Sequence, residues 1–248
     1  VGAHPTMVEI TRYAMEKSDA VTAVSKSLAM DTEQIFHITP GKVKVLYNFI
    51  NPKNFNPSLK SVTEGQEPKE KTIIIHLSNL RAVKRPLDVI RIYYQIYKKI
   101  SRPVELHVIG EGPMQYEMMI LAEKMGIEHS VKFLGARSDI GTVIASSDLM
   151  LLPSQNESFG MAALEAMACQ VPVVASRVGG LVEVIEDGRS GFLHAIGDID
   201  EAAEKAVNVL ENTKLYDSII TEALKVALVK FSMEDIINQY ERIYKDGK

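Results

Sequence analysis

Two glutamates stand eight positions apart in the stretch NESFGMAALEAMACQVPVV, residues 156–174. Glu157 lies in a polar turn, whereas Glu165 lies in MAALEAMAC, where every neighbour is apolar or small. On a helix, the positions three and four residues from Glu165 offer it no polar face. Burying a carboxylate is costly unless hydrogen bonds satisfy it. Two adjacent hydroxyl groups, as in a ribose diol, would satisfy Glu165 without a counter-charge; the alternative is an arginine or backbone partner elsewhere in the fold.

The segment between these glutamates is a second candidate for binding. We expect a strand to end near Ser154 and a helix to begin near Phe159 and Gly160. The first backbone N–H groups of a helix lack partners within the helix, so they suit phosphate or sugar oxygens. Glu157 lies just before this helix, where a negative charge also favours the helix by itself.

A basic turn, HLSNLRAVKRP at residues 76–86, likewise follows a strand and precedes a helix. Arg81, Lys84 and Arg85 lie in this turn, although positive charge at a helix start opposes the macrodipole. Arginine with its planar fork and lysine as a point charge could clamp a diphosphate. A solvated basic loop is the alternative interpretation.

Three glycine turns are weaker candidates. VIGEGP contains Gly110 and Gly112, which permit a close backbone approach, but it lacks the G-x-G-x-x-G spacing of a dinucleotide site. FLGARSDI offers Arg137 beside a loop that could face a flat base, although an exposed arginine explains it as well. Gly179 and Gly180 could add backbone contacts to an anion.

No set of histidine, cysteine and carboxylate residues has convincing metal spacing, so we expect no metal and no cofactor. Asp198 and Asp200 have the D-x-D spacing that holds a metal in some transferases, but the helix that follows them favours capping. The single cysteine, Cys169, lies on an apolar helix and is interpreted as inert core.

The elements that must position these residues alternate along the chain. Short apolar β-branched runs predict strands, and longer periodic stretches between them predict helices. Such alternation is typical of βαβ units in a doubly wound parallel sheet, where ligands bind at the carboxyl ends of the strands. The predicted strands are 20–25, 43–48, 72–78, 105–110, 131–135, 149–154, 171–176 and 191–194. The predicted helices are 6–18, 26–37, 86–100, 114–125, 138–146, 160–169, 180–187, 200–211, 213–229 and 233–245.

One break interrupts this pattern. Residues 51–71 hold three prolines, few aliphatic side chains and many charges, which is typical of a linker. It separates a short piece, residues 1–50, from a compact α/β unit at about 72–230. The short piece has only two strands and two helices, too few to close a sheet of its own.

The composition limits the function. The 248 residues are 46% hydrophobic, which suffices for a packed α/β core, and the net charge of −4 argues against nucleic acid as a partner. We expect small-molecule partners and no integral membrane segment, because no apolar run approaches the roughly 20 residues that span a bilayer. One cysteine and no signal peptide favour the cytoplasm. The oligomeric state stays open, and a homo-oligomer is one of the states that the sequence allows.

As a set, the motifs resemble the retaining glycosyltransferases of family 4, which have the GT-B architecture. The resemblance rests on the spacing of Glu157 and Glu165, the SFG after the first glutamate, and EAMACQVPVVAS, VGGLVEVI, VIGEGP and FLG. It covers nearly the whole chain. It implies an α/β fold in which 1–50 is a remnant of the acceptor-side N-terminal domain, 51–71 a linker, 72–230 the Rossmann-like nucleotide-sugar domain, and 231–248 a helix that packs toward the N-terminal domain.

The resemblance also implies roles. Arg81 and Lys84 would neutralise a departing UDP diphosphate, Glu165 would hold the ribose hydroxyls, and Arg137 would border the uracil. Gly110 and Gly112 would lie at the nucleotide site. Glu157 would hold the donor sugar hydroxyls and the β-phosphate, together with the backbone of Ser158, Phe159, Gly160 and Met161. The reaction would be a front-face displacement with retention, in which stabilisation of the leaving diphosphate is the main device.

A narrower resemblance concerns HLSNLRAVKRPLDVI, TAVSKSL and LYNFINP. They are similar to the branch of the family that transfers N-acetylglucosamine from UDP-GlcNAc to L-malate in bacillithiol biosynthesis. Most of the family has Gly-Arg where this chain has Ser78-Asn79, so Arg81 is the expected substitute for that arginine. The alternatives are a family 4 enzyme of cell-wall or polysaccharide synthesis, a related sugar epimerase, and a nucleotide-binding module without catalysis. Because much of the first GT-B domain would precede Val1, we expect this chain to bind UDP or a UDP-sugar without transferring sugar.

Overall fold

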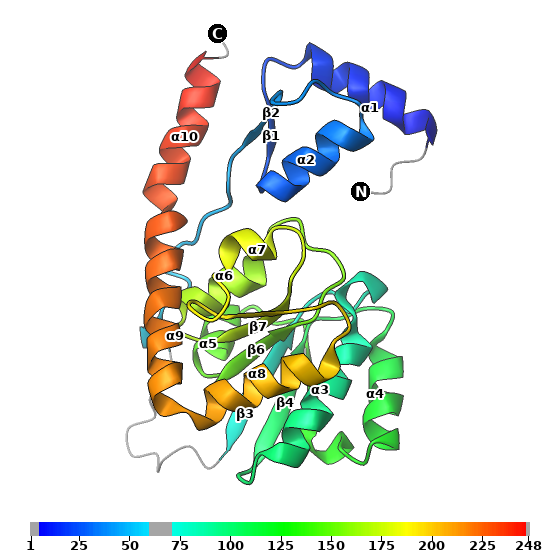
Figure 1. The fold of residues 1–248 in the computed structure, drawn as a ribbon, viewed down its shortest axis with the longest axis vertical. Coiled ribbons are helices and arrows are strands. Elements are labelled where there is room, and N and C mark those ends of the chain that lie inside the picture. Colours follow the sequence, from blue (N-terminus) through cyan, green and yellow to red (C-terminus); the bar gives the residue numbers. More distant parts are fainter. Residues whose placement is uncertain (1–4, 60–70, 247–248) are drawn as a thin grey trace.

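The computed structural model describes residues 5–59 and 71–246, and it has a small upper unit above a larger α/β domain (Figure 1). The upper unit holds two helices and two strands, and the larger domain holds a sheet between two layers of helices. Of the predicted linker 51–71, residues 60–70 lie outside the described residues, as do residues 1–4 and 247–248.

The larger domain is built on a parallel sheet of six strands in the order β5-β4-β3-β6-β7-β8. Its strands are β3 (Thr72–Leu77), β4 (Val104–Ile109), β5 (Val131–Gly135), β6 (Leu149–Leu152), β7 (Val173–Ser176) and β8 (Phe192–His194). The sequence order reverses direction between β3 and β6, which pair in register from Ile74 with Leu149. The central strands β6 and β7 are buried at every position, as expected for parallel strands covered on both faces.

Two apolar layers cover the sheet. One side packs against α5 (Ile140–Ala145), α6 (Met161–Ala168) and α7 (Leu181–Val184), and against a π-helical turn, η4 (Val226–Lys230). The other side packs against α3 (Pro86–Lys99), α4 (Gln115–Lys124) and α8 (Ile199–Glu211). Alternate residues of each strand enter opposite layers, so that Ile75 belongs to the first layer and Ile74 to the second.

The upper unit contains α1 (Pro5–Lys17), β1 (Val21–Ala23), α2 (Lys26–Ile35) and β2 (Val43–Val45), and β1 pairs with β2 in parallel. After α9 (Thr213–Lys225) and η4, helix α10 (Met233–Asp246) runs upward beside this unit (Figure 1). Tyr240 and Ile243 of α10 line a hollow together with Leu46 of the upper unit. The described part of the predicted helix 231–248 therefore lies against the N-terminal residues.

Within the described residues, every predicted strand and helix has a counterpart, and the ends differ by a few residues. The three-residue 3-10 turns η1 (Pro57–Leu59), η2 (Ala82–Lys84) and η3 (Glu128–Ser130) were not predicted. The predicted helix 213–229 changes to π geometry at Val226. Among the described residues, no helix combines the length and the apolarity that crossing a bilayer requires.

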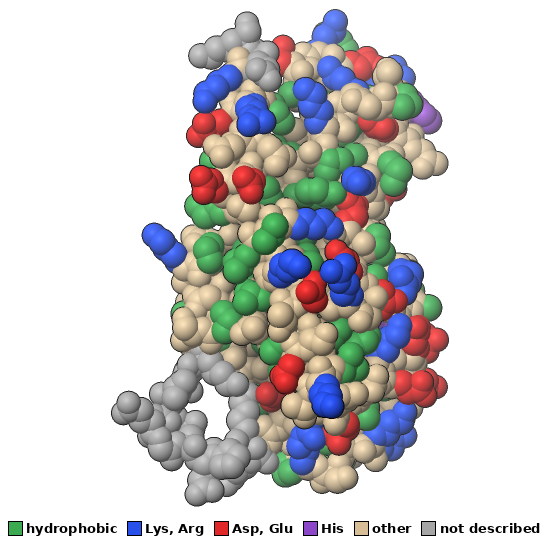
Figure 2. Space-filling model, turned by 60° about the vertical axis from the view of Figure 1, so that its left-hand side comes forward, with side chains coloured by type: hydrophobic (Ala, Val, Ile, Leu, Met, Phe, Trp, Pro, Cys, Tyr) green, Lys and Arg blue, Asp and Glu red, His purple; other side chains and the backbone are tan. Residues whose placement is uncertain are grey.

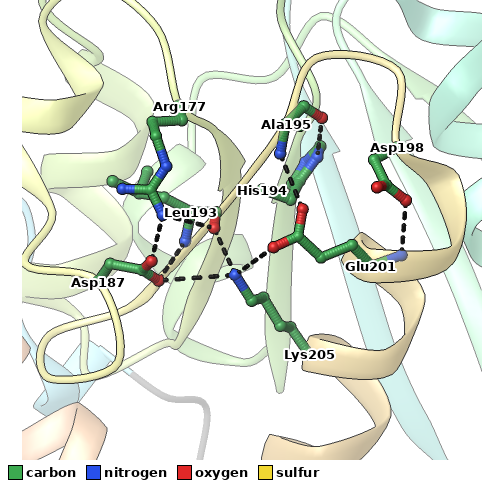
Figure 3. A network of polar contacts seen from close by, with 8 residues as sticks. All are labelled: Arg177, Asp187, Leu193, His194, Ala195, Asp198, Glu201 and Lys205. Atoms are coloured by element: carbon green, nitrogen blue, oxygen red, sulfur yellow. Dashed lines mark hydrogen bonds and ion pairs between the residues drawn. The ribbon is translucent and has the colours of Figure 1, made fainter.

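The outer edge of β8 is closed by charged side chains (Figure 3). The Leu193 N–H donates to Asp187 Oδ1 at 2.8 Å, and the Leu193 carbonyl accepts from Lys205 Nζ at 2.5 Å. Lys205 also contacts Glu201 at 2.8 Å, and Arg177 pairs with Asp187. These bonds occupy backbone groups that an unprotected edge would offer to another strand, so the network protects the sheet edge.

Candidate functional site

The candidate site lies at the carboxyl ends of β3 and β6, the two strands between which the order of the sheet reverses. In open α/β sheets, loops diverge at this point and leave a crevice for a ligand. The loops here are residues 78–85 after β3 and 153–160 after β6. They are joined by the backbone, because the Gln155 N–H donates to the Val83 carbonyl at 2.8 Å. The basic turn and the first glutamate, far apart in sequence, thus lie on adjoining loops.

Lys84 and Glu157 form an ion pair across these loops. Lys84 Nζ lies 2.7 Å from Glu157 Oε1, and the Ser154 hydroxyl donates to the same oxygen at 2.9 Å. The two charged side chains are 22% and 14% exposed, so the pair is partly shielded from water but still reachable. An ammonium group has three donors. The contact with Glu157 uses one of them, which holds Lys84 in place and leaves donors for an anion.

Arg81 and Glu165 contrast with this pair because their side chains form no hydrogen bond or ion pair with the residues that the structure describes. Arg81 is exposed, and only its backbone carbonyl is used, by the Lys84 N–H at 2.8 Å. Glu165 is half-buried, and this burial raises the pKa of its carboxyl group to about 7. The neighbouring Arg85 is different, since its guanidinium group pairs with the buried Asp88 at 2.6 Å.

The start of α6 lies directly after Glu157. Gly160 precedes the helix with a φ of 102°, and a Cβ atom added there would lie 2.6 Å from Leu181 Cδ2. Only glycine therefore fits at this position without strain or displacement. The N–H groups of the first turn, beginning at Met161, have no intrahelical partner and can meet an anion. At a rise of 1.5 Å per residue, Glu165 lies about 6 Å from Met161 along the helix.

The ring of Phe159 and the backbone carbonyl of Ser158 already have partners within the protein. The Phe159 ring is buried against Tyr47 and Phe231, with ring centroids 6.2 and 5.4 Å away. The Ser158 carbonyl accepts from the Ser25 hydroxyl at 2.6 Å. Phe159 can thus offer a ligand only backbone atoms, as the predicted role requires, and the carbonyl of Ser158 already has a partner.

The glycines were predicted to let a ligand approach the backbone closely. In the structure, the groups that approach Gly110 and Gly112 are backbone atoms of a neighbouring loop. A Cβ atom on Gly110 would lie 2.0 Å from the Ser78 carbonyl oxygen, and one on Gly112 would lie 2.0 Å from that of Asn79. The Gly110 N–H donates to the Gly135 carbonyl at 2.8 Å, and the Gly180 N–H donates to that of Glu157 at 2.8 Å. Gly110 and Gly112 thus position the loop that carries Arg81, and their contact with a nucleotide stays a prediction.

Arg137 is exposed just after β5, and its guanidinium group makes a bidentate contact with the Asp139 carboxylate, at 2.8 and 2.6 Å. This pairing raises the pKa of the Arg137 guanidinium and lowers the pKa of the Asp139 carboxyl. A ligand that used the fork of Arg137 would have to compete with Asp139.

Asp198 and Cys169 have the structural roles that the sequence predicted. Asp198 caps α8, because its carboxylate accepts from the Glu201 N–H at 2.9 Å, so the capping interpretation of the D-x-D motif is confirmed. Cys169 is buried, and burial raises the pKa of its thiol to about 12. It is therefore unreactive core, as predicted.

His76, which was not among the predicted site residues, anchors the basic loop. His76 is fully buried, and its Nδ1–H donates to the Leu151 carbonyl of β6 at 2.8 Å. Its Nε2 accepts from the Ser78 hydroxyl at 2.8 Å, and the same hydroxyl oxygen accepts from the Leu80 N–H at 3.2 Å. Burial lowers the pKa of His76 to about 4, so the ring is neutral and the network complete. A lone histidine inside the apolar run TIIIHL was the available signal.

A different hollow, of about 520 Å³, lies between residues 50–53 and 228–238 and contains none of these charged groups. Its walls include Ile50, Leu228 and Met233. Figure 2 shows apolar side chains gathered around the middle of the molecule, where the upper unit meets the larger domain. Its charged lining residues are Lys53 and Glu234, and no ion pair joins them to each other among the described contacts. The charged loops at the carboxyl ends of β3 and β6 are therefore the better candidate.

The order of the parallel sheet, with its reversal between β3 and β6, defines a doubly wound α/β protein of the Rossmann type. The family described as "Glycosyl transferases group 1" matches residues 60–226, and the chain belongs to this family.

The curated relatives agree with this assignment. The chain is 37% identical over 250 residues to N-acetyl-alpha-D-glucosaminyl L-malate synthase of Bacillus anthracis, an alignment that covers 99% of this chain and 64% of the relative. It is 32% identical over 247 residues to an uncharacterized glycosyltransferase of Methanocaldococcus jannaschii, covering 94% of this chain and 63% of that protein. The chain thus spans less than two thirds of the length of either relative.

Solved structures show the same fold. HepE of Anabaena, in complex with UDP and glucose, superposes with a TM-score of 0.87 at 27% identity, over 97% of this chain and 67% of that one. TarM of S. aureus superposes with a TM-score of 0.81 at 22% identity, over 98% of this chain and 47% of that one. The α/β fold with its parallel sheet is therefore that of the GT-B glycosyltransferases, as the sequence predicted.

Proposed function

We propose that this chain is the donor-binding part of a retaining glycosyltransferase that transfers N-acetylglucosamine from UDP-GlcNAc to L-malate. The observation that carries the proposal is the Lys84–Glu157 pair beside Arg81, at the carboxyl ends of β3 and β6. The named activity of the Bacillus anthracis relative supports the substrates, and the UDP and glucose bound by Anabaena HepE support a UDP-sugar donor.

In this proposal each charged group has one task. Arg81 and Lys84 face the diphosphate, the α6 start and Glu157 hold the β-phosphate and sugar hydroxyls, and Glu165 accepts from the two ribose hydroxyls. Ser158, Phe159, Gly160 and Met161 contribute backbone atoms. Arg137 borders the uracil, and Gly110 and Gly112 shape the loop beside it. The pairing of Lys84 with Glu157 before a ligand arrives supports this arrangement, because it reduces the reorganisation that binding requires.

The chemistry would be a displacement on one face of the sugar. The bond from the anomeric carbon to the β-phosphate oxygen breaks, and the acceptor hydroxyl oxygen bonds to the same carbon from the same side. The hydroxyl proton passes to the departing phosphate. Negative charge grows on UDP as it leaves, and two side-chain cations with a helix start offset that charge. In this proposal they do so without a metal or other cofactor.

We place the enzyme in the cytoplasm, since the sequence has one cysteine, and that residue is buried. A homo-oligomer is compatible with the proposal.

The first test is calorimetry of this chain with UDP, GDP and ADP. UDP should bind, and Glu165→Ala should weaken binding by about tenfold or more, the cost of losing hydrogen bonds to a charged group. Glu204→Ala is the matched control, because Glu204 is a 72% exposed carboxylate on α8 and remote from the crevice. Unchanged UDP affinity in a folded Glu165→Ala variant would remove the ribose role.

The second test is product analysis of the natural protein with UDP-GlcNAc and L-malate. The expected product is N-acetylglucosaminyl malate with the α configuration of the donor, identified by mass spectrometry and NMR. Transfer to another acceptor, or from another UDP-sugar, would replace the substrates and keep the reaction type. UDP binding with no transfer to any acceptor would favour a nucleotide-binding module.

A further inference from the structure

Glu183 lies in α7, outside the residues so far given a role, and its carboxylate reaches the upper unit. Glu183 Oε1 accepts from the Ser27 N–H at 2.9 Å, and Oε2 accepts from the Lys26 N–H at 3.0 Å. The Tyr47 hydroxyl donates to Oε2 at 3.0 Å. Lys26 is the first residue of α2, so a carboxylate from the larger domain caps the start of a helix in the upper unit.

This cap matches the electrostatics of a helix start. The first N–H groups of α2 have no partner within the helix and carry partial positive charge, which a carboxylate offsets. Hydrogen bonds to an ionised acceptor are stronger than neutral ones. The backbone of Glu183 is held as well, because its main-chain carbonyl accepts from Lys230 Nζ at 2.6 Å. Glu183 thus ties α2 to the turn after Gly180.

A second contact lies beside it. Ser25 caps α2, since its hydroxyl oxygen accepts from the Leu28 N–H at 3.0 Å, and the same hydroxyl donates to the Ser158 carbonyl at 2.6 Å. Ser158 belongs to the 157–160 loop. The start of α2 is therefore bonded at two points, once to Glu183 and once to the loop that precedes α6.

Tyr47 connects the two points. Its hydroxyl binds Glu183, and its ring packs on Phe159 and Phe231 with centroids 6.2 and 5.5 Å away. Burial, together with the bond to Glu183, raises the pKa of Tyr47 to about 12, so its hydroxyl remains a donor. Removal of the carboxylate would leave one phenol and two helix N–H groups without their acceptor.

We infer that Glu183 is a positioning residue for sugar transfer, holding the start of α2 against the 157–160 loop so that the upper unit fixes the sugar and β-phosphate side of the donor site. The inference rests on the proposed function of that loop. The ribose carboxylate, Glu165, lies further along α6 and makes no contact with Glu183. Loss of Glu183 should therefore slow transfer while nucleotide affinity is kept.

Glu183→Gln in the natural protein tests this division. Glutamine has a single acceptor oxygen, and its NH₂ group would face an N–H or O–H donor. We expect kcat to fall about tenfold or more, while the UDP-GlcNAc KM and the UDP affinity change less than about threefold. Glu183→Asp keeps the charge and should recover part of kcat. Glu186→Gln, an exposed carboxylate of the same turn paired with Arg189, should leave kcat unchanged.

Hydrogen exchange supplies a readout that does not depend on activity. In Glu183→Gln, exchange should rise at the amides of residues 26–28 and 157–161 and stay unchanged in β3. Tyr47→Phe should give a smaller rise, and the double variant should show no additional loss of kcat beyond Glu183→Gln, because both act through one contact. Wild-type kcat in Glu183→Gln, or equal losses of kcat and UDP affinity, would overturn the inference. Failure of the unaltered protein to bind UDP would instead overturn the proposed function, and the exchange result would still decide whether Glu183 holds the loop.

Discussion

Two charged clusters of this molecule lie near the same sheet and differ in how completely the fold satisfies them. At the edge of β8, Arg177, Asp187, Lys205 and Glu201 pair with one another and with the Leu193 backbone (Figure 3). At the carboxyl ends of β3 and β6, Lys84 and Glu157 pair, while the side chains of Arg81 and Glu165 have no partner among the described residues.

The difference separates charge that serves the fold from charge that is available to a ligand. A half-buried carboxylate without a partner costs stability, and a protein keeps such a group where function repays the cost. The β8 network contains as many charged side chains as the candidate site, but they pair with one another and with the backbone of Leu193. Charge density alone therefore does not locate the candidate site, whereas the two charged side chains without a described partner, beside the Lys84–Glu157 pair, distinguish it from the β8 network. Each of the following predictions tests that distinction.

The largest effect is expected at Lys84. In the natural protein, Lys84→Met should lower kcat by about 100-fold or more, because a cation that faces the leaving diphosphate is lost. Its matched partner is Lys205→Met, which removes the same charge from the β8 network and should leave kcat within about twofold. Steady-state kinetics of the two variants measure this difference in kcat. Equal losses of kcat would show that Lys205 also serves transfer, so that the β8 network would belong to the functional site.

The next effect concerns Glu165 and pH. Because the folded pKa of Glu165, about 7, lies above the ordinary glutamate value of 4.5, its contribution to stability is full below pH 4.5 and is lost as pH rises through 7. Glu165→Gln lacks this titration, so its stability relative to the wild type should rise by about 3 kcal/mol between pH 4.5 and 8.

Urea unfolding of both proteins across this range measures the difference, and titrations common to both cancel. Addition of UDP should oppose the trend in the wild type, since a ligand of the ionised carboxylate stabilises that form. A flat difference between the two proteins would mean that the carboxylate is satisfied after all.

Lys205→Met should lower the stability of the protein and leave UDP binding unchanged, because the β8 network serves the fold. The Leu193 carbonyl and Glu201 lose a donor, so the free energy of unfolding should fall by about 1–2 kcal/mol. Calorimetric affinity for UDP should stay within about twofold of the wild type. Loss of UDP binding in a folded variant would extend the functional site to the β8 edge.

The smallest effect is expected at Arg137, where the sequence-based role and the observed pairing disagree most. Its fork is exposed and engaged by Asp139, so Arg137→Ala should leave the melting temperature unchanged and lower UDP affinity by less than about threefold. A tenfold loss of UDP affinity would show that a paired arginine can still serve the ligand, which would weaken the pairing rule.

The fold was predictable because its signals are local. Runs such as TIIIHL and LMLL form fully covered parallel strands, and the stretches between them have the period of helices. The juxtaposition of Lys84 and Glu157 was predictable as well, since each follows a strand and the carboxyl ends of parallel strands meet at one edge.

The missed features depend on contacts between distant parts of the chain. His76 reaches a carbonyl 75 positions away, and Glu183 reaches α2 across 156 and 157 positions. No local pattern distinguishes these residues from an ordinary core histidine or surface glutamate. For Gly110 and Gly112 the need for a close approach was foreseen, but the group that approaches is a neighbouring loop. Sequence spacing shows which positions lack a side chain and does not show what fills the space.

That glycine contact limits how this protein can diverge. Alanine at Gly112 would place a methyl carbon 2.0 Å from the Asn79 oxygen, so the loop bearing Arg81 would have to retreat for the substitution to be accepted. The backbone path of residues 78–79 therefore requires glycine at positions 110 and 112. Descendants that acquire a different donor should keep this pair of loops and change at the less constrained rim, where positions such as Arg137 are open to solvent.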